Sequence, residues 1–191
     1  MRVTLFNCSP RKDGNTYTGL KIIAGELEKE SISTGIVQMG CEKIYGCDAC
    51  GICKKTKSGF CNIKDDMVND SIKKVYESEG FIIGSPTYFG SVTAEAKAFI
   101  DRLGYASRAA GMKLNRKAAA GIAIARRAGA VDAVLQINKM FLISGCIIPC
   151  SSYWNMAIGR EKGDILNDAE GIETFINLGK NMAWLLNKIN G

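Results

Sequence analysis

GFIIGSPTYFGSVTAEAKAFIDR, residues 80–102, joins an unbroken apolar run to a helical pattern through a turn of proline, glycine and aromatic residues. The apolar run 80–85 lacks the alternation of a strand with one solvated face, which is typical of a strand covered on both faces. The pattern over about 92–105 predicts a helix. A buried strand followed by a helix is the repeating unit of a parallel α/β sheet.

The same unit recurs along the chain. Apolar runs that predict strands occupy 2–7, 35–39, 80–85, 118–125 and 146–150. Helical patterns cover about 16–31, a segment that begins near Asp65 or Asp66, and about 92–105, 131–144 and 169–188. We therefore expect residues 1–191 to form one doubly wound α/β domain with helices on both faces and a cysteine-rich loop at 46–62. Ligands of such sheets bind at the carboxyl ends of the strands.

Composition excludes several classes of function. The chain has no histidine, which removes histidine-based triads and zinc–histidine sites. Its net charge is +6, but the basic residues are interspersed with acidic ones, so we expect no nucleic-acid partner. No apolar run approaches the roughly 20 residues that span a bilayer, and the first residues lack a signal-peptide pattern, which predicts a cytoplasmic protein without a membrane partner.

The loop after the first strand, NCSPRKDGNTYTG (7–19), carries polar groups at the start of a helix. It matches neither the Walker motif nor the G-x-G-x-x-G dinucleotide motif. Free N–H groups at a helix start suit a phosphate monoester, whereas the alternative is a plain N-cap by Asn15 or Thr16. The loop offers hydroxyls, amides and a base for this role, namely those of Ser9, Arg11, Asn15, Thr16 and Thr18.

Two further loops follow the third and fourth predicted strands. In the first, Pro86 and Gly90 fix a turn, and Tyr88 and Phe89 offer a flat apolar wall for a heteroaromatic ring or fold into the core. In the second, IARRAGAVD (124–132), the arginines are either solvated or stabilise negative charge on a bound ring.

The motifs SPRKDGNT (9–16), SPTYFGSVTAEAKAFIDR (85–102) and RRAG (126–129) together resemble the NADPH-dependent FMN reductase group of the flavodoxin-like superfamily. With the cysteine loop, the chain is similar to the iron–sulfur flavoproteins of that group. The resemblance implies the strand order 2-1-3-4-5 and FMN at the strand ends, with its phosphate in the loop of Ser9, Arg11, Asn15 and Thr16. It also implies that the flavin ring contacts Pro86, Thr87, Tyr88, Phe89 and Gly90, with Arg126, Arg127 and Gly129 at its pyrimidine side.

The segment GCDACGICKKTKSGFC (46–61) has the spacing Cys47-x2-Cys50-x2-Cys53-x7-Cys61. Two consecutive x2 gaps are typical of a ferredoxin-type [4Fe–4S] site, and a zinc site more often has widely separated pairs. Free thiols, a disulfide or adventitious zinc are the alternatives. The other cysteines, Cys8, Cys41, Cys146 and Cys150, are expected to be buried packing residues, and Asp65-Asp66 is expected to begin a helix.

The sequence therefore predicts an FMN-binding oxidoreductase in which the flavin carries the chemistry. Electrons would pass, through a [4Fe–4S] cluster, between ferredoxin or NAD(P)H and a small acceptor such as a quinone or oxygen. The resemblance also implies a homodimer or homotetramer. The alternatives are an NAD(P)H-dependent flavin or quinone reductase without a cluster, and a zinc- and nucleic-acid-binding module.

Overall fold

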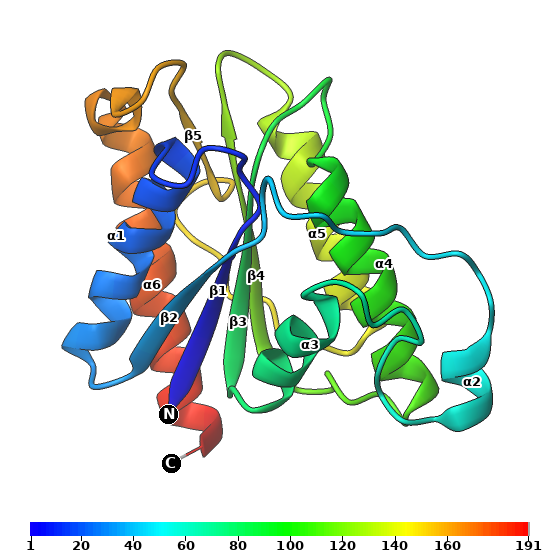
Figure 1. Ribbon diagram of the computed structural model, residues 1–191. Helices are drawn as coiled ribbons and strands as arrows, with labels where there is room; N and C mark the ends of the chain where they lie inside the picture. The colour runs from blue at the N-terminus through cyan, green and yellow to red at the C-terminus, as the bar shows by residue number, and fades with distance from the viewer. Residues whose placement is uncertain (191) are drawn as a thin grey trace.

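A computed structural model of the protein describes residues 1–190, and all five of its strands form one parallel sheet (Figure 1). The strands are β1 (Arg2–Asn7), β2 (Ser33–Gln38), β3 (Gly80–Pro86), β4 (Ala118–Ala125) and β5 (Met156–Ile158). Their order is β2-β1-β3-β4-β5, which confirms the predicted 2-1-3-4-5 topology. The order reverses between β1 and β3, and in such sheets this is where a ligand crevice opens.

Helices cover both faces of the sheet, as expected (Figure 1). On one face lie α1 (Asn15–Lys29) and α6 (Ala169–Asn190), and on the other lie α3 (Val68–Tyr76), α4 (Ala94–Ala109) and α5 (Ala130–Ile143). Two short elements were not predicted, namely the helix α2 (Ile52–Thr56) inside the cysteine loop and the 3-10 helix η1 (Asp164–Asn167). None of the helices in residues 1–190 is both long and apolar enough to cross a bilayer.

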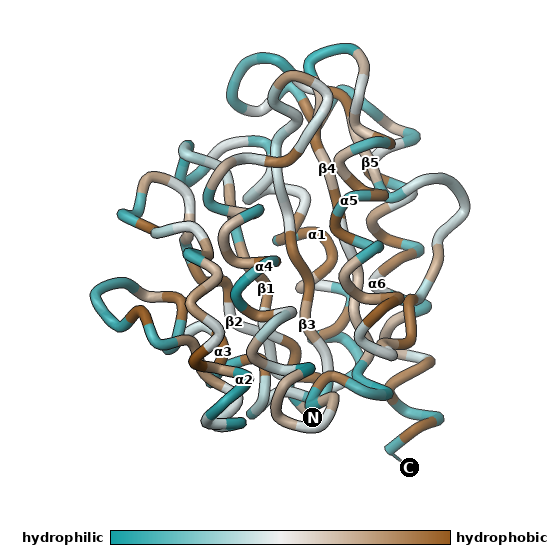
Figure 2. The backbone as a smooth tube through the Cα atoms, turned by 90° about the vertical axis from the view of Figure 1, so that its right-hand side faces the viewer, coloured by the Kyte–Doolittle hydropathy of each residue, from teal (hydrophilic) through white to brown (hydrophobic). Residues whose placement is uncertain are grey.

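The central strands consist of small and apolar residues because helices press on them from both sides. All eight residues of β4, AAAGIAIA, are buried. A methyl group added at Gly121 would lie 2.9 Å from the Ile137 side chain, so glycine there lets α5 approach the sheet closely. Figure 2 shows the hydrophobic colouring concentrated along β3 and β4.

The prediction of the last strand at 146–150 was wrong. In that run only residue 147 pairs with the sheet, in an isolated bridge to Ala118 in which the Ile147 N–H bonds the Lys117 carbonyl at 2.9 Å. Pro149 has no N–H to donate, and the chain leaves the sheet there. It returns as β5, which pairs with residues 123–125 of β4. The loop that follows the last strand is therefore 159–163, and it carries residues of the site.

Candidate functional site

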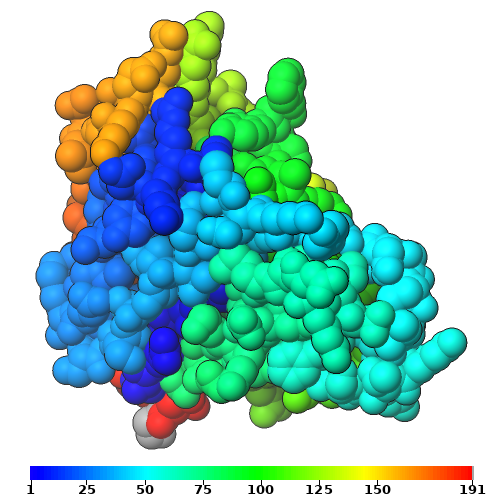
Figure 3. Space-filling model, in the orientation of Figure 1, coloured from blue at the N-terminus to red at the C-terminus, as the bar shows by residue number. Residues whose placement is uncertain are grey.

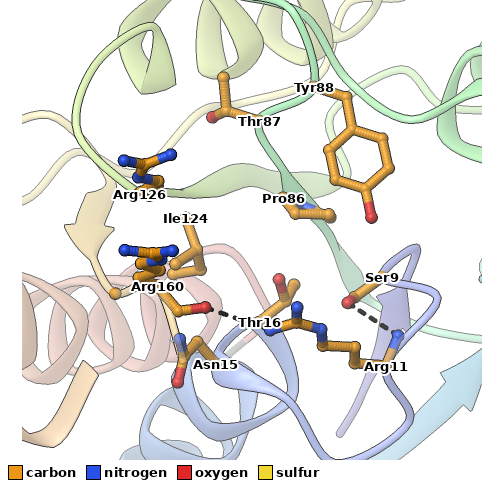
Figure 4. A pocket seen from close by; sticks show the side chains of 11 residues that line it. Ser9, Arg11, Asn15, Thr16, Pro86, Thr87, Tyr88, Ile124, Arg126 and Arg160 are labelled. Atoms are coloured by element: carbon orange, nitrogen blue, oxygen red, sulfur yellow. Dashed lines mark hydrogen bonds between the residues drawn. The ribbon is translucent and has the colours of Figure 1, made fainter. Parts of the chain in front are cut away.

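A cavity of about 140 Å³ opens at the carboxyl ends of the strands, where four loops meet (Figure 4). It lies on the edge of the sheet that the fold predicted. In Figure 3 these loops form the top of the molecule. The lining residues are Ser9, Arg11, Asn15, Thr16, Pro86, Thr87, Tyr88, Ile124, Arg126, Gly159 and Arg160.

The floor of the cavity is the start of α1, which no side chain caps. The first intrahelical hydrogen bond runs from the Thr18 N–H to the Gly14 carbonyl, at 3.0 Å. The amides of Asn15 and Thr16 therefore have no acceptor inside the helix. Such amides, together with the positive end of the helix dipole, attract an anion.

The loop before α1 is held by residues that the sequence analysis missed. The Asn7 amide donates to the Lys12 carbonyl at 3.2 Å and to the Gln38 side chain at 2.6 Å, and its oxygen accepts from the Ser9 N–H. Gln38 in turn donates to the Ser9 carbonyl at 2.8 Å. Asn7 and Gln38 are each the last residue of their strand. This position is the sequence signal that could have pointed to the two residues.

Asn15 lines the cavity, but its side chain is already engaged. Its Nδ2 donates to the Glu161 carbonyl at 2.8 Å, and its Oδ1 accepts from the Gly163 N–H at 2.9 Å. Arg11 similarly donates to the Arg160 carbonyl at 3.1 Å. The side chain of Asn15 thus fixes the 159–163 loop, and its backbone amide and the second N–H of Nδ2 remain for a ligand.

Gly159 and Arg160 were absent from the predicted site because the last strand was assigned too early. A methyl group at Gly159 would lie 2.6 Å from Asn15 Nδ2, so a larger residue would push the loop away from α1. Arg160 faces Arg126 across Ile124 on one wall of the cavity, opposite Ser9 and Tyr88 (Figure 4).

The opposite wall is a tight turn after β3. The Tyr88 and Ser91 backbones exchange hydrogen bonds of 2.9 and 3.0 Å, and the two residues between them, Phe89 and Gly90, have φ values of 50° and 74°. Two consecutive positive φ angles are the signature of a type I′ turn. Phe89 is fully exposed at its tip and does not line the cavity.

Thr87 and Gly129 connect this turn to the loop after β4. The Thr87 N–H bonds the Ile124 carbonyl at 2.8 Å, and its buried hydroxyl has no partner in residues 1–190. Gly129 has φ of 84°, and a methyl group there would lie 3.1 Å from the Gly90 Cα. Gly129 therefore supports the turn from behind, whereas Arg127 is exposed and outside the cavity lining.

These groups fit a flavin mononucleotide. Uncapped amides and Arg11 suit its phosphate, and the unpartnered Thr87 hydroxyl can bond a polar ligand atom. The turn at 88–91 offers an exposed backbone and an aromatic face beside the cavity.

The cysteine segment 46–61 lies elsewhere, on the flank of α4 (Figure 1). Lys54 of α2 lies over the Tyr105 ring of α4, 5.4 Å from its centroid. All eight cysteines are free. Among residues 1–190, no group of three or more Cys, Asp or Glu side chains is close enough to bind a metal ion. The four candidate ligand cysteines are therefore all free, but their sulfurs are not gathered around a common centre.

Two of these sulfurs already interact with the protein. Cys61 accepts a hydrogen bond from Arg102 Nε at 3.2 Å. The Ile52 amide on its own would lower the pKa of the Cys50 thiol, but hydrogen bonding to Asp48, burial and the Asp48 charge outweigh it and leave the pKa raised. Cys61 also lines a cavity of about 580 Å³ that none of the other three cysteines reaches.

The remaining cysteines follow the expectation only in part. Cys8 is fully buried, and burial raises the pKa of its thiol strongly. Cys146 is half-buried, and Cys41 and Cys150 are exposed, so the prediction that they are packing residues was wrong for these last two. Each of them lies in a loop outside the helices and strands.

Comparison with known proteins identifies the family. The model of the family described as NADPH-dependent FMN reductase matches residues 1–161. The chain belongs to the NADPH-dependent FMN reductase family. It is accordingly an FMN-dependent oxidoreductase.

Curated relatives of similar sequence are named iron–sulfur flavoproteins. The chain is 34% identical to an iron–sulfur flavoprotein of Methanocaldococcus jannaschii, with 96% of each chain covered. It is 31% identical to an iron–sulfur flavoprotein of Methanosarcina thermophila, covering 78% of this chain and 76% of that one. Among solved structures, the WrbA-like flavodoxin of Agrobacterium tumefaciens superposes with a TM-score of 0.66 at 16% identity, covering 98% and 97% of the two chains. That likeness shows the flavodoxin-like fold.

Proposed function

We propose that this FMN reductase family member binds FMN in the cavity at the strand ends, with the phosphate against the first turn of α1. Arg11 and the Thr16 hydroxyl complete the phosphate site, and the ring lies against the turn of Pro86 to Gly90, with Arg126 at its pyrimidine side. The observation that carries the proposal is the uncapped start of α1, which faces that turn across one cavity.

The bound flavin would supply hydride and electron transfer, while the chain holds and orients it. Thr93 ties the two halves of the site together, because its hydroxyl donates to the Cys8 carbonyl at 3.0 Å and also caps α4. Gln136 pins the turn by accepting from the Ser91 hydroxyl at 2.6 Å and from the Val92 N–H at 3.2 Å. These contacts fix the turn at 88–91, where the ring would lie, relative to the loop before α1, where the phosphate would lie.

The donor would be NAD(P)H or a ferredoxin, and the acceptor a small molecule such as a quinone or oxygen. Tyr88 is 49% exposed, which leaves an open aromatic edge beside the cavity for a second planar molecule.

The test of the proposal is to purify the protein without oxygen, record a flavin spectrum and measure NAD(P)H oxidation with a quinone as the acceptor. A protein that shows no flavin spectrum after reconstitution with FMN would refute the proposal.

We further propose that Cys47, Cys50, Cys53 and Cys61 bind a [4Fe–4S] cluster. Support comes from their spacing and from the names of the relatives. Because the sulfurs are apart in the structure, binding requires residues 47–53 to close on Cys61. Iron and sulfide assays would give about four irons per chain, lost in Cys61→Ser and kept in the control Cys41→Ser, whose cysteine lies outside the segment.

The alternative is an NAD(P)H-dependent flavin or quinone reductase without a cluster, and the separation of the sulfurs favours it. It predicts iron-free protein in which Cys50→Ser leaves quinone reduction unchanged. Membership of the FMN reductase family favours both flavoprotein proposals over a zinc- and nucleic-acid-binding module.

A homodimer or homotetramer is also proposed. Within one chain, the length of α4 separates the cavity at the strand ends from the cysteine segment. Thr93 beside the cavity and Arg102 beside Cys61 are nine residues apart, or about 14 Å of helix rise. Assembly would let the cysteine segment of one subunit approach the flavin of another. Sedimentation equilibrium gives the mass, and a monomer at working concentration would contradict this proposal.

A further inference from the structure

A groove of about 570 Å³ lies between α4 and α5, which cover the same face of the sheet (Figure 1). Its apolar lining consists of Ile100 and Tyr105 from α4 and Met140 and Ile143 from α5. Tyr105 and Ile143 are 52% and 60% exposed, and Leu142, the neighbour of Ile143 in α5, is 68% exposed. Large apolar side chains gathered on one exposed face, with charged residues around them, mark an interaction surface.

The α4 side of the groove is a single stripe of the helix. Four residues line it at the spacing i, i+3, i+4 and i+7, namely Asp101, Gly104, Tyr105 and Arg108. An acid and a base thus stand about 10 Å of helix rise apart, with a glycine and an aromatic residue between them. When such a helix is reversed end to end, its acid comes opposite the base of the original helix. The stripe is therefore complementary in charge to an antiparallel copy of itself.

Both charged groups can bond a partner from outside the chain. Arg108 is exposed and forms no salt bridge within residues 1–190, where its Nη1 donates to the Ile143 carbonyl and to Met112 Sδ at 3.5 Å. Asp101 is paired with Lys97 at 2.6 Å, but a carboxylate accepts about four hydrogen bonds. Each group therefore keeps hydrogen-bonding capacity for an opposite charge.

We propose that a second copy of this chain docks on the groove, with the two α4 helices antiparallel about a two-fold axis near Gly104 and Tyr105. The inference rests on the proposed homo-oligomer and names its interface. A two-fold axis makes every contact twice, so Asp101 of each copy faces Arg108 of the other. Glycine at the crossing point lets the two helices approach closely, and each Tyr105 ring packs in the groove of the other copy.

The apolar residues supply the affinity of this interface, and the charges set its orientation. Removing Tyr105 and Ile143 of both copies from water is favourable in proportion to the area buried. Exposed ion pairs add little net affinity, but like charges placed opposite each other are strongly unfavourable. With the two α4 helices parallel, Asp101 would face Asp101 and Arg108 would face Arg108. The charges therefore select the antiparallel arrangement.

The antiparallel arrangement also fits the assembly proposed above, in which the cysteine segment of one subunit approaches the flavin of another. The groove reaches both regions of the chain. Gln136 lines it and accepts from the Ser91 hydroxyl of the turn at 88–91, at 2.6 Å. Further along α4, the Tyr105 ring lies under Lys54 of the cysteine segment. Reversing one copy therefore brings its cysteine segment toward the turn at 88–91 of the other.

Charge reversal tests the arrangement, with the dissociation constant of the FMN-reconstituted protein measured by sedimentation equilibrium. Asp101→Arg places two arginines opposite Arg108 in the interface, one in each copy, and Arg108→Asp places two aspartates opposite Asp101. Each single variant should associate at least about tenfold more weakly than wild type or, where wild type is a tetramer, leave dimers. The double variant restores both pairs and should regain most of the affinity.

Mixing the two single variants controls for misfolding. Each should associate weakly alone, whereas an equimolar mixture should form a heterodimer, because one copy then presents two basic residues to two acidic residues of the other. A variant that had lost its fold could not recover in this way. The matched control is the exposed pair Lys73–Glu77 of α3, outside the groove, where Lys73→Glu and Glu77→Lys should leave the dissociation constant unchanged.

The outcomes separate this interface from the proposals on which it rests. Wild-type protein that is monomeric at working concentration overturns the homo-oligomer and this interface together, whereas FMN binding is decided by the flavin spectrum. A wild-type oligomer that the single reversals do not weaken overturns this interface and leaves the homo-oligomer standing. Single variants whose mixture does not associate have the same consequence.

Discussion

The cavity at the strand ends and the cysteine segment on α4 are built in contrasting ways. The cavity is lined by loops that are already hydrogen-bonded to one another, as when Asn15 holds the 161–163 backbone and Thr93 holds Cys8. The cysteine segment is anchored at its ends by Arg102, which donates to the Tyr45 carbonyl at 3.0 Å and to the Ile63 carbonyl at 2.9 Å. Between those anchors Cys47 and Cys50 are exposed, and among residues 1–190 the sulfurs do not converge.

The difference follows from what holds each region in place. Loops at the end of a parallel sheet are positioned by strands and helices whose apolar residues are buried whether or not a ligand is present. A four-thiolate site has no such support, since the ligand set is completed by the metal itself and metal binding supplies folding free energy. We therefore expect the first region to be preformed, and the second to close only around the proposed cluster.

The largest effect is expected where the cysteine segment meets the core. Asp66→Asn leaves the Arg102 guanidinium buried without its counterion, and breaking a buried pair in this way costs about 3–5 kcal/mol of the free energy of unfolding. Urea denaturation measures it. The neighbouring exposed Asp65→Asn is the matched control and should change stability by less than about 0.5 kcal/mol.

The same pair predicts a pH dependence. Burial on its own would raise the pKa of Asp66, but the hydrogen bonds from Arg102 and from the Tyr45 and Val68 amides outweigh it and hold the pKa below its usual value. A lowered carboxyl pKa gives stability that is present above the unfolded-state pKa of about 3.9 and lost as the pH falls through the folded-state pKa. The advantage of wild type over Asp66→Asn should therefore shrink below about pH 4. An advantage that grows on acidification would contradict this account of the pair.

A smaller effect is expected at the phosphate site. Thr16 is 1% exposed and lines the cavity, and Thr16→Val removes its hydroxyl at nearly constant shape. A hydrogen bond to a charged group is worth about 1.5–3 kcal/mol, so FMN affinity should fall by roughly 10- to 100-fold. Fluorescence titration measures it. Thr18→Val is the control, because the Thr18 hydroxyl bonds the Gly14 carbonyl and lies outside the cavity lining.

The smallest effect is expected behind the ring turn. Gly129→Ala places a side chain in the left-handed region, at a cost of about 1–2 kcal/mol, and brings its methyl group against Gly90. FMN affinity should fall several-fold. Gly111→Ala carries the same backbone cost, but nothing in residues 1–190 lies within 4 Å of the added methyl group, so this variant should leave FMN affinity unchanged. Equal FMN affinities in the two variants would show that Gly129 does not support the site.

The sheet and much of the cavity could be predicted from the sequence, because buried strands and the loops at their ends have local sequence patterns. The apolar runs predicted the sheet, and the polar loop 7–19 predicted the start of α1 with Ser9 and Arg11. Gly159 and Arg160 could not be predicted, because both Ile147 and β5 pair with the same edge of β4. Only the tertiary pairing shows which of the two segments is the fifth strand.

Long-range contacts were equally invisible to sequence reasoning. Arg102 follows an acidic residue at the end of FIDR and reads as a solvated helix position, yet its partners are residues up to 57 positions away. Asp66 was predicted as a helix-start residue, and it does accept the Val68 N–H, but its main contact is with Arg102. Such contacts depend on how the segment packs on α4, which no local pattern encodes.

The central claim is that the uncapped start of α1 is the phosphate half of a preformed FMN site. It is tested most directly by titrating flavin-free protein with FMN and with riboflavin, which lacks the phosphate. The account predicts that FMN binds at least about tenfold more tightly, and that Thr16→Val weakens FMN binding but not riboflavin binding. Equal affinities for the two flavins would contradict it.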